Sequence, residues 1–187
     1  MLDRYHQKYR IPSTRLQKFD YSSNGYYFVT ICTKDKENCF GEVVNNKMQL
    51  SGIGKIVKTY WFRIQNHFSF VITDEFIIMP NHIHGIMVIC HNNKTNNDIY
   101  NNNGRDMINH VSTWKKMTPM GKYTLGEIIR WYKGIVTFHI RNKLCNTFSW
   151  QPRFYDHIIR DEKSLLSIRE YIHNNPKNWE EDEENTI

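Results

Sequence analysis

The sequence predicts an α+β fold in which helices pack on an antiparallel sheet in a split β-α-β arrangement. Two observations predict this fold. Stretches rich in β-branched and aromatic residues alternate with stretches whose apolar residues recur at helical spacing. Their order is strand, helix, strand, strand, helix, strand, and then a last helix. A chain of 187 residues suits one domain with a real hydrophobic core, so we treat residues 1–187 as a single unit.

The predicted strands are short apolar runs bounded by turn residues. A hairpin is expected where Asn45-Asn46 separates two of these runs. The two runs on either side of Met79-Pro80-Asn81 are apolar on both faces, which is typical of central strands. The predicted strands are 26–33, 40–44, 47–50, 70–78, 83–90 and 154–159.

Three helices are predicted from apolar repeats that follow a capping residue. Ser51 precedes a repeat over about 52–66, and Thr124 opens a capping-box pattern before the repeat at 125–142. Asp161 precedes the last helix, which Pro176 cannot continue. Because a proline biases the residue before it away from helical angles, we expect Asn175 to leave the helical conformation.

His82 and His84 are the most informative residues, because they flank one apolar residue within a predicted strand. Side chains alternate along a strand, so both imidazoles should lie on one face and Ile83 on the other. Such a pair supplies half of a metal site. A structural zinc site with Cys90 is an alternative that we disfavour, and by itself the His-x-His pattern has a real false-positive rate.

Tyr171 and Asn175 lie one helical turn apart near the end of the last helix. Two imidazoles and a carboxamide oxygen form a mixed ligand set that suggests Mg²⁺ or Mn²⁺. A tyrosine beside such a metal suggests phosphodiester chemistry through a phosphotyrosine. Tyr155 is a rival nucleophile with no amide partner at helical spacing, and His157 is either a core residue or a support for the metal ligands.

The charge distribution favours a polyanionic partner, with nucleic acid first. The formal charge is +6, and five acidic residues gather at 180–184. The remaining chain therefore carries 25 basic against 14 acidic residues. The helix predicted at 125–142 carries Arg130, Lys133 and Arg141 opposite its apolar stripe. These three residues, with Arg153, are the predicted phosphate contacts.

Three segments differ from the rest in composition. Residues 1–25 are a basic, aromatic arm, 92–104 are an asparagine-rich loop, and 180–187 are an acidic tail. The sequence opens without an apolar leader and contains no run of the ~20 apolar residues that a membrane span needs. We therefore expect a cytoplasmic protein with four free cysteines and no membrane partner.

Taken together, these stretches resemble the single-strand transposases of the HUH class, in the branch that includes the REP-associated tyrosine transposases. The resemblance runs in order through YFVTICT, DEFIIMPNHIHGI, WQPRFYDHIIR and YIHNNP, at residues 27–33, 74–86, 150–160 and 171–176. The combination is far more specific than the histidine pair alone.

The resemblance implies a ferredoxin-like core, His82 and His84 as metal ligands, Asn175 as the third ligand and Tyr171 as the nucleophile. It also implies a 5′-phosphotyrosine formed on single-stranded DNA beside a hairpin, and a DNA-binding role for the basic helix. Members of this class occur as dimers and as monomers, and the sequence leaves both open. The alternative function is a catalytically idle or domesticated regulator that binds single-stranded nucleic acid on the same fold.

Overall fold

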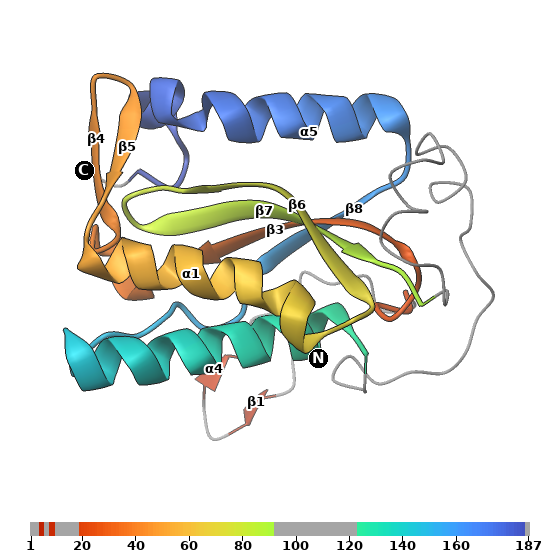
Figure 1. The fold of residues 1–187 in the computed structure, drawn as a ribbon, viewed down its shortest axis with the longest axis horizontal. Helices are drawn as coiled ribbons and strands as arrows, with labels where there is room; N and C mark the ends of the chain where they lie inside the picture. The colour runs from red at the N-terminus through yellow and green to blue at the C-terminus, as the bar shows by residue number, and fades with distance from the viewer. Residues whose placement is uncertain (1–3, 6–7, 10–18, 92–122, 186–187) are drawn as a thin grey trace.

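The computed structural model describes residues 4–5, 8–9, 19–91 and 123–185. Its centre is a four-stranded antiparallel sheet in the order β6-β7-β3-β8 (Figure 1). α5 covers one face of the sheet, and α1 and α4 cover the other. The bounds are β3 (Gly25–Cys32), α1 (Gly52–His67), β6 (Val71–Ile78), β7 (His82–Ile89), α4 (Leu125–Lys143), β8 (Tyr155–Ile159) and α5 (Glu162–Asn174). The predicted α+β fold with its β-α-β-β-α-β order is confirmed.

The smaller elements lie outside this sheet. β1 (Arg4–Tyr5) pairs with β2 (Lys8–Tyr9), and a short 3-10 helix, η1, spans Lys34–Lys36. Most of the predicted arm 1–25, the asparagine-rich stretch 92–104 and the last two residues of the acidic tail lie outside the described residues. Within the described ranges, no helix is long and apolar enough to cross a membrane.

All three predicted helix caps are confirmed. Ser51 Oγ accepts a hydrogen bond from the backbone of Gly54 at 3.1 Å, and Asp161 Oδ1 accepts one from Ser164 at 2.8 Å. Thr124 caps α4 by accepting from Glu127 at 3.3 Å. Each bond satisfies a backbone N–H that has no partner inside its own helix, which is why these residues set where the helices begin.

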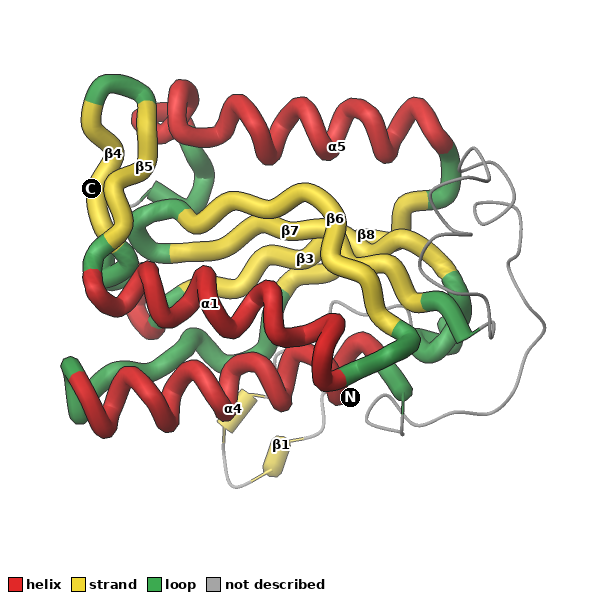
Figure 2. The backbone as a smooth tube through the Cα atoms, viewed as in Figure 1, coloured by secondary structure: helices red, strands yellow, loops and turns green. Residues whose placement is uncertain are grey.

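The predicted hairpin is also confirmed, as β4 (Gly41–Val44) paired with β5 (Lys47–Leu50). Its two turn residues, Asn45 and Asn46, have φ of 51° and 60°. Both therefore adopt the left-handed conformation that a two-residue hairpin turn requires and that asparagine tolerates. The hairpin stands at the end of the sheet, beside the carboxyl end of α5 (Figure 2).

Because side chains alternate along β7, this strand contributes to a hydrophobic core on each face of the sheet. Ile83 and Met87 face α1 and α4, where they join a cluster around Trp61 and Tyr132. Ile86 and Val88 face α5 and pack in a second, smaller cluster with residues of that helix. His82 and His84 have the same parity as this second pair, so they lie on the α5 face of the sheet.

Two local predictions are wrong. β6 is an edge strand and not the predicted central strand. Its sequence is apolar on both sides because helices cover both of its faces, and this pattern does not indicate where a strand lies in the sheet. A bulge between Thr73 and Phe76 carries Asp74 and Glu75, as is typical of an edge. Asn175 is helical, with φ −54° and ψ −41°.

The second error has a structural consequence. α5 ends at Asn174 as an α-helix, but the chain continues directly into a second 3-10 helix, η2 (Asn175–Glu181). Pro176 sits in the first turn of η2, where its missing N–H costs nothing. The proline therefore changes the type of helix instead of ending helical structure.

Gly85 offers a test of the packing beneath the histidine pair. A Cβ at this position would lie 2.3 Å from a ring carbon of the buried Trp61. We expect Gly85→Ala to lower the free energy of unfolding by about 1–3 kcal/mol, the usual cost of overpacking. Thermal unfolding followed by circular dichroism measures it. The control is Gly134→Ala in α4, where a Cβ meets nothing within 4 Å and should stabilise by about 0.5–1 kcal/mol. Equal melting temperatures for the two variants would contradict this packing.

Candidate active site

The two histidines lie side by side on the central strand β7, as predicted. Their ring centroids are 4.4 Å apart, and both side chains are buried. In the ladder with β3, His82 stands opposite Cys32 and His84 opposite Thr30. A strand that is paired on both sides holds the two imidazoles rigidly, which is what a metal site requires.

One nitrogen of each imidazole is held by a neighbouring polar group. Nδ1 of His84 lies 2.9 Å from Oγ1 of Thr30, and Nδ1 of His82 lies 2.8 Å from Oδ1 of Asn81. The Asn81 amide donates both of its hydrogens elsewhere, to the carbonyls of Lys36 and Glu184. Its oxygen must therefore accept from His82, so Nδ1 of His82 carries the proton and Nε2 presents a lone pair.

Burial keeps both imidazoles neutral. It is the main reason that the pKa of His82 and that of His84 fall to about 3. The positive charge of Lys36 lowers the pKa of His82 further, whereas Asp182 opposes the shift of His84. A neutral imidazole is the form that binds a metal, so these residues need no deprotonation at neutral pH.

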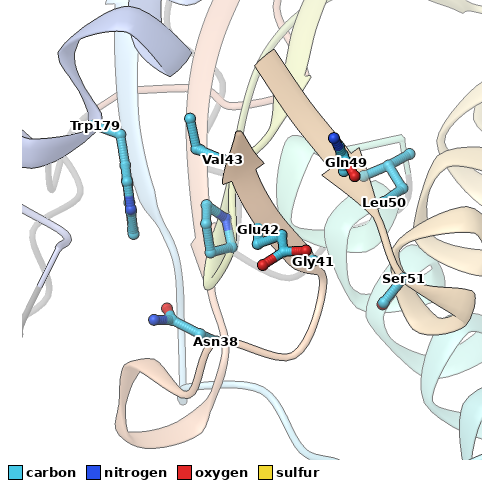
Figure 3. A pocket seen from close by; sticks show the side chains of 9 residues that line it. Asn38, Gly41, Glu42, Val43, Gln49, Leu50, Ser51 and Trp179 are labelled. Carbon is cyan, nitrogen blue, oxygen red and sulfur yellow. The ribbon is translucent and has the colours of Figure 1, made fainter. Parts of the chain in front are cut away.

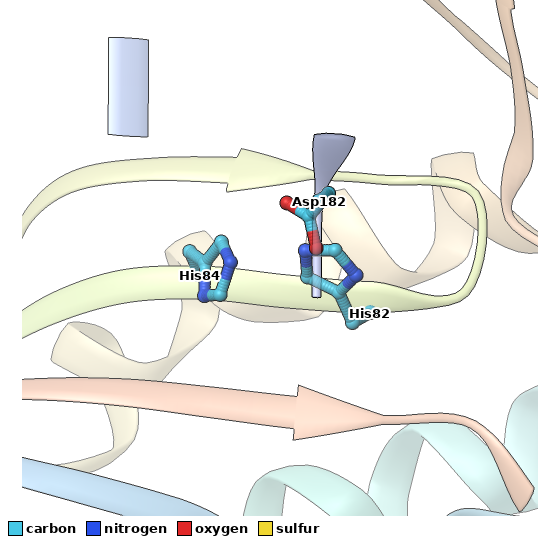
Figure 4. A group of neighbouring side chains, drawn as sticks. All are labelled: His82, His84 and Asp182. Atoms are coloured by element: carbon cyan, nitrogen blue, oxygen red, sulfur yellow. The ribbon is translucent and has the colours of Figure 1, made fainter. Parts of the chain in front are cut away.

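Asp182 completes the group from the end of η2. The ligand atoms of His82, His84 and Asp182 all lie within 4.8 Å of one another (Figure 4). Sequence reasoning missed this residue, which belongs to the acidic tail and follows no recognisable spacing from the histidines. Only the structure reveals it, because η2 turns the tail back over β7.

Asn175, the predicted third ligand, lies next to this group. It is buried, and its Nδ2 donates to Oδ2 of Asp182 at 2.7 Å. Its Oδ1 and Nε2 of His82 have no hydrogen-bond partner among the described residues. Two buried, unpartnered electron-pair donors beside a carboxylate fit a divalent cation, which accepts O and N ligands of this kind.

The predicted nucleophile reaches the same place from α5. The hydroxyl of Tyr171 lies 3.1 Å from Nε2 of His84, and the residue remains 46% exposed. Burial is the main cause that raises the pKa of Tyr171 to about 12, and the carboxylates of Asp182, Glu183 and Glu184 add to it. A hydrogen bond with Asn175 acts in the opposite direction. The phenol therefore carries its proton at neutral pH.

The rival residues lie on the same face of the sheet but farther across it. Tyr155 stands opposite Thr30 and His157 opposite Phe28, both on β8. Phe28 itself stacks on His84, with ring centroids 5.3 Å apart. Among the described residues, no hydrogen bond or ring contact joins Tyr155 or His157 to the histidine pair.

Two of the four predicted phosphate contacts, Lys133 and Arg141, donate hydrogen bonds to backbone carbonyls. Lys133 Nζ donates to the carbonyls of Gln151 and Arg153 at 2.6 and 2.8 Å, and burial lowers the pKa of Lys133 to about 8. Arg141 donates to the carbonyl of Phe148 at 2.8 Å. The side chains of Arg130, Arg141 and Arg153 are exposed. α4 thus uses part of its positive charge to hold the loop that precedes β8.

Comparisons with known proteins bear on the fold and on the family of the chain. No protein-family model matches the chain. The fold resembles that of a REP-associated tyrosine transposase solved in complex with a REP hairpin, with a TM-score of 0.55 and 16% identity over 90% of this chain and 74% of that one. The fold is therefore that of the REP-associated tyrosine transposases.

Sequence similarity shows which protein family the chain belongs to. The chain is 42% identical over 172 residues to an uncharacterized protein of Haemophilus influenzae, covering 91% of each, and it belongs to the same family as that protein. It is 26% identical over 158 residues to a second protein of that species, named "Putative REP-associated tyrosine transposase". That similarity covers 84% of this chain and 73% of the relative.

Asp182 can be tested by metal binding alone. We expect Asp182→Asn to weaken Mn²⁺ binding about tenfold to hundredfold, since an amide brings no negative charge to the cation. Isothermal titration calorimetry of the full chain measures the affinity. Glu180→Gln, an exposed acid of the same tail outside the group, should bind like the unsubstituted protein. If Asp182→Asn keeps full affinity while His84→Ala loses it, Asp182 is not a ligand.

Proposed function

We propose that this chain is a metal-dependent transposase that cleaves and rejoins single-stranded DNA beside a hairpin, with Tyr171 as its nucleophile. The carrying observation is the phenol oxygen of Tyr171 within 3.1 Å of His84, at the edge of a group of metal-ligating side chains. The similarity to a named tyrosine transposase and the fold shared with a hairpin-bound one support DNA as the substrate.

The reaction exchanges one phosphodiester for another. Oη of Tyr171 attacks the scissile phosphorus, the bond from phosphorus to the 3′ oxygen breaks, and a 5′-phosphotyrosine forms. The departing strand end takes up a proton as a 3′-hydroxyl. Rejoining reverses these steps with a 3′-hydroxyl as the attacking group, so the phosphate ester is conserved and no external energy source is needed.

The cation would be held by His82, His84, Asp182 and the amide oxygen of Asn175. Mg²⁺ or Mn²⁺ suits this donor set. When bound, such a cation polarises the phosphate and stabilises the charge that develops during attack. The residues around it have separate tasks. Thr30 and Asn81 orient the imidazoles, and Asn175 holds the carboxylate of Asp182 through its side-chain N–H.

The phenol must lose its proton as it attacks. Its pKa of about 12 means that the neutral phenol dominates in the resting protein. Because nearly half of Tyr171 is exposed, solvent water can take the proton as the bond to phosphorus forms. Cationic charge at the histidine group would offset the neighbouring carboxylates that oppose ionisation.

The nucleophile is tested by covalent attachment. Tyr171→Phe should abolish a covalent protein–DNA band on a denaturing gel with labelled hairpin-bearing single strands and Mn²⁺, while it leaves hairpin affinity nearly unchanged. Tyr155→Phe is the matched control and should keep the band. A band that survives in Tyr171→Phe and disappears in Tyr155→Phe would reverse the assignment. Hairpin binding without any band from the unsubstituted protein would favour the idle regulator.

The exposed cations of α4 and its neighbouring loop are the proposed phosphate contacts. For single strands, each contact contributes about 0.7 to the slope of log K against log salt. We expect Arg130→Ala to reduce that slope by about this amount. Lys133→Ala should instead lower the melting temperature, because its ammonium bonds two backbone carbonyls. Fluorescence anisotropy across a salt series separates the two effects, and an unchanged slope in Arg130→Ala would remove that residue from the interface.

A further inference from the structure

An ion pair joins α5 to the sheet close to the proposed nucleophile. Nε of Arg169 donates to Oδ1 of Asp74 at 3.2 Å, and a terminal nitrogen of the same guanidinium bonds Oδ2 of the same carboxylate. Two bonds between these planar groups fix their mutual orientation as well as their distance. Arg169 precedes Tyr171 by two residues on α5, and the proposed reaction gives the Asp74–Arg169 pair no role.

The bulge of β6 directs Asp74 toward α5. Two residues of β6, Asp74 and Glu75, stand opposite the single residue Ile86 of β7. Ile86 belongs to the core beneath α5, whereas Phe76, which follows the bulge, stacks on Trp61 in the core beneath α1. The extra residue therefore lets β6 present a carboxylate to one helix layer and still return an aromatic ring to the other. Bulges beside active sites commonly redirect a side chain in this way.

Arg169 and Tyr171 flank the apolar stripe of α5 on opposite sides. Ile168 and Ile172 face the sheet. At about 100° per residue, Arg169 stands about 100° to one side of Ile168 and Tyr171 about 60° to the other. Arg169 reaches the edge strand β6, and Tyr171 reaches His84 on β7. Because the two contacts lie on either side of the stripe, together they set the rotation of α5 about its axis.

The other contacts of this segment define that rotation less sharply. Within α5, only Leu165 and Ile172 are buried, and the hydrophobic effect that holds them is non-directional. Beyond α5, η2 faces the β4–β5 hairpin across a cavity of about 580 Å³. Figure 3 shows Trp179 of η2 on one side of this cavity and Val43 of the hairpin on the other. The ion pair supplies the directional contact that the apolar ones do not.

A small rotation of α5 would affect the reaction. At about 6 Å from a helix axis, a turn of about 10° moves an atom by about 1 Å. The hydroxyl of Tyr171 lies 3.1 Å from Nε2 of His84, so a shift of this size would take the phenol oxygen out of hydrogen-bond reach. Misplacing a reacting group by about 1 Å costs about hundredfold in rate.

We propose that the Asp74–Arg169 pair positions the nucleophile, by fixing the rotation of α5 so that Oη of Tyr171 stays beside the histidine group. The inference rests on the proposed function for the reaction that this position serves. Asp74 and Arg169 are positioning residues, because they act through the helix that carries the phenol.

The kinetic test separates position from affinity. Arg169→Gln and Asp74→Asn should each slow formation of the covalent band about tenfold to hundredfold at saturating hairpin-bearing strand and Mn²⁺, with little change in the Kd of the strand. The matched controls are Glu75→Gln, the other acid of the bulge, and Lys163→Gln, an exposed cation of α5. Both controls should keep the rate of the unsubstituted protein.

The double variant tests whether the two residues act as one unit. If each acts only through the other, Asp74→Asn combined with Arg169→Gln should be no slower than the slower single variant. Losses that multiply in the double variant would overturn the proposal. A smaller salt slope and weaker strand binding in Arg169→Gln at an unchanged saturated rate would overturn it too, because Arg169 would then be a phosphate contact.

The position of the phenol can also be measured without DNA. The ring of Tyr171 lies edge-on to that of Phe28, with centroids 6.3 Å apart, and its centroid is 5.2 Å from that of His84. Nuclear Overhauser effects between these rings should be present in the unsubstituted protein and in both controls. They should weaken in the two single variants of the pair. Circular dichroism melting checks that each variant is folded.

Ring-to-ring effects that persist at full strength in both single variants would overturn the proposal. Failure of the proposed function would look different. The unsubstituted protein would then form no covalent band, while the weakened effects would still be measured in the two single variants. The two inferences can therefore fail separately.

Discussion

The side-chain amide of Asn81 holds together three parts of the chain that are remote in sequence. Its two hydrogens go to carbonyls of Lys36, after β3, and Glu184, in the acidic tail, and its oxygen accepts from His82. Because the amide is 1% exposed, loss of any one bond would leave a buried polar atom unsatisfied. The tautomer of His82 is thus set by the same bonds that hold the tail against the sheet, and the site is part of the hydrogen-bond network of the fold.

The acidic side chains around the site favour the binding of a cation over the binding of DNA. The chain as a whole is basic, yet the pKa of Tyr171 is raised first by burial and then by the carboxylates of Asp182, Glu183 and Glu184. Lys36 offsets part of this charge through its ion pair with Glu184 at 3.2 Å. A phosphate that approached these carboxylates without a cation would be repelled, so under the proposed function the binding of a divalent cation and the binding of the DNA phosphate should favour each other.

The sequence was sufficient for features that depend on local chemistry. Alternation along β7 correctly placed both histidines on one face, and the caps at Ser51, Thr124 and Asp161 correctly marked three helix starts. Asn45-Asn46 correctly indicated the hairpin, because its residues tolerate the left-handed conformation. These features are decided within a few residues of one another.

Features that depend on distant segments could not be predicted in this way. The edge position of β6 follows from strand order, which its apolar pattern does not encode. Asp182 reaches the histidines only because η2 continues past Pro176, and the sequence of the tail is that of an ordinary solvated acidic run. The hydrogen bonds of Lys133 could not be predicted either, because its acceptors, the carbonyls of Gln151 and Arg153, belong to a loop that folds back onto α4.

Tyr171 and Asn175 lie on the continuous helical segment formed by α5 and η2, and Asp182 follows directly after that segment. The proposed nucleophile and two of the candidate ligands therefore belong to one stretch of chain, residues 171–182, whereas His82 and His84 belong to the sheet. Local opening of this segment would withdraw the phenol, the amide and the carboxylate together and would leave the imidazoles in place. A cation bridging the two units would slow amide hydrogen exchange along residues 171–182 in particular. The exchange protection of this segment would thus report on the occupancy of the site.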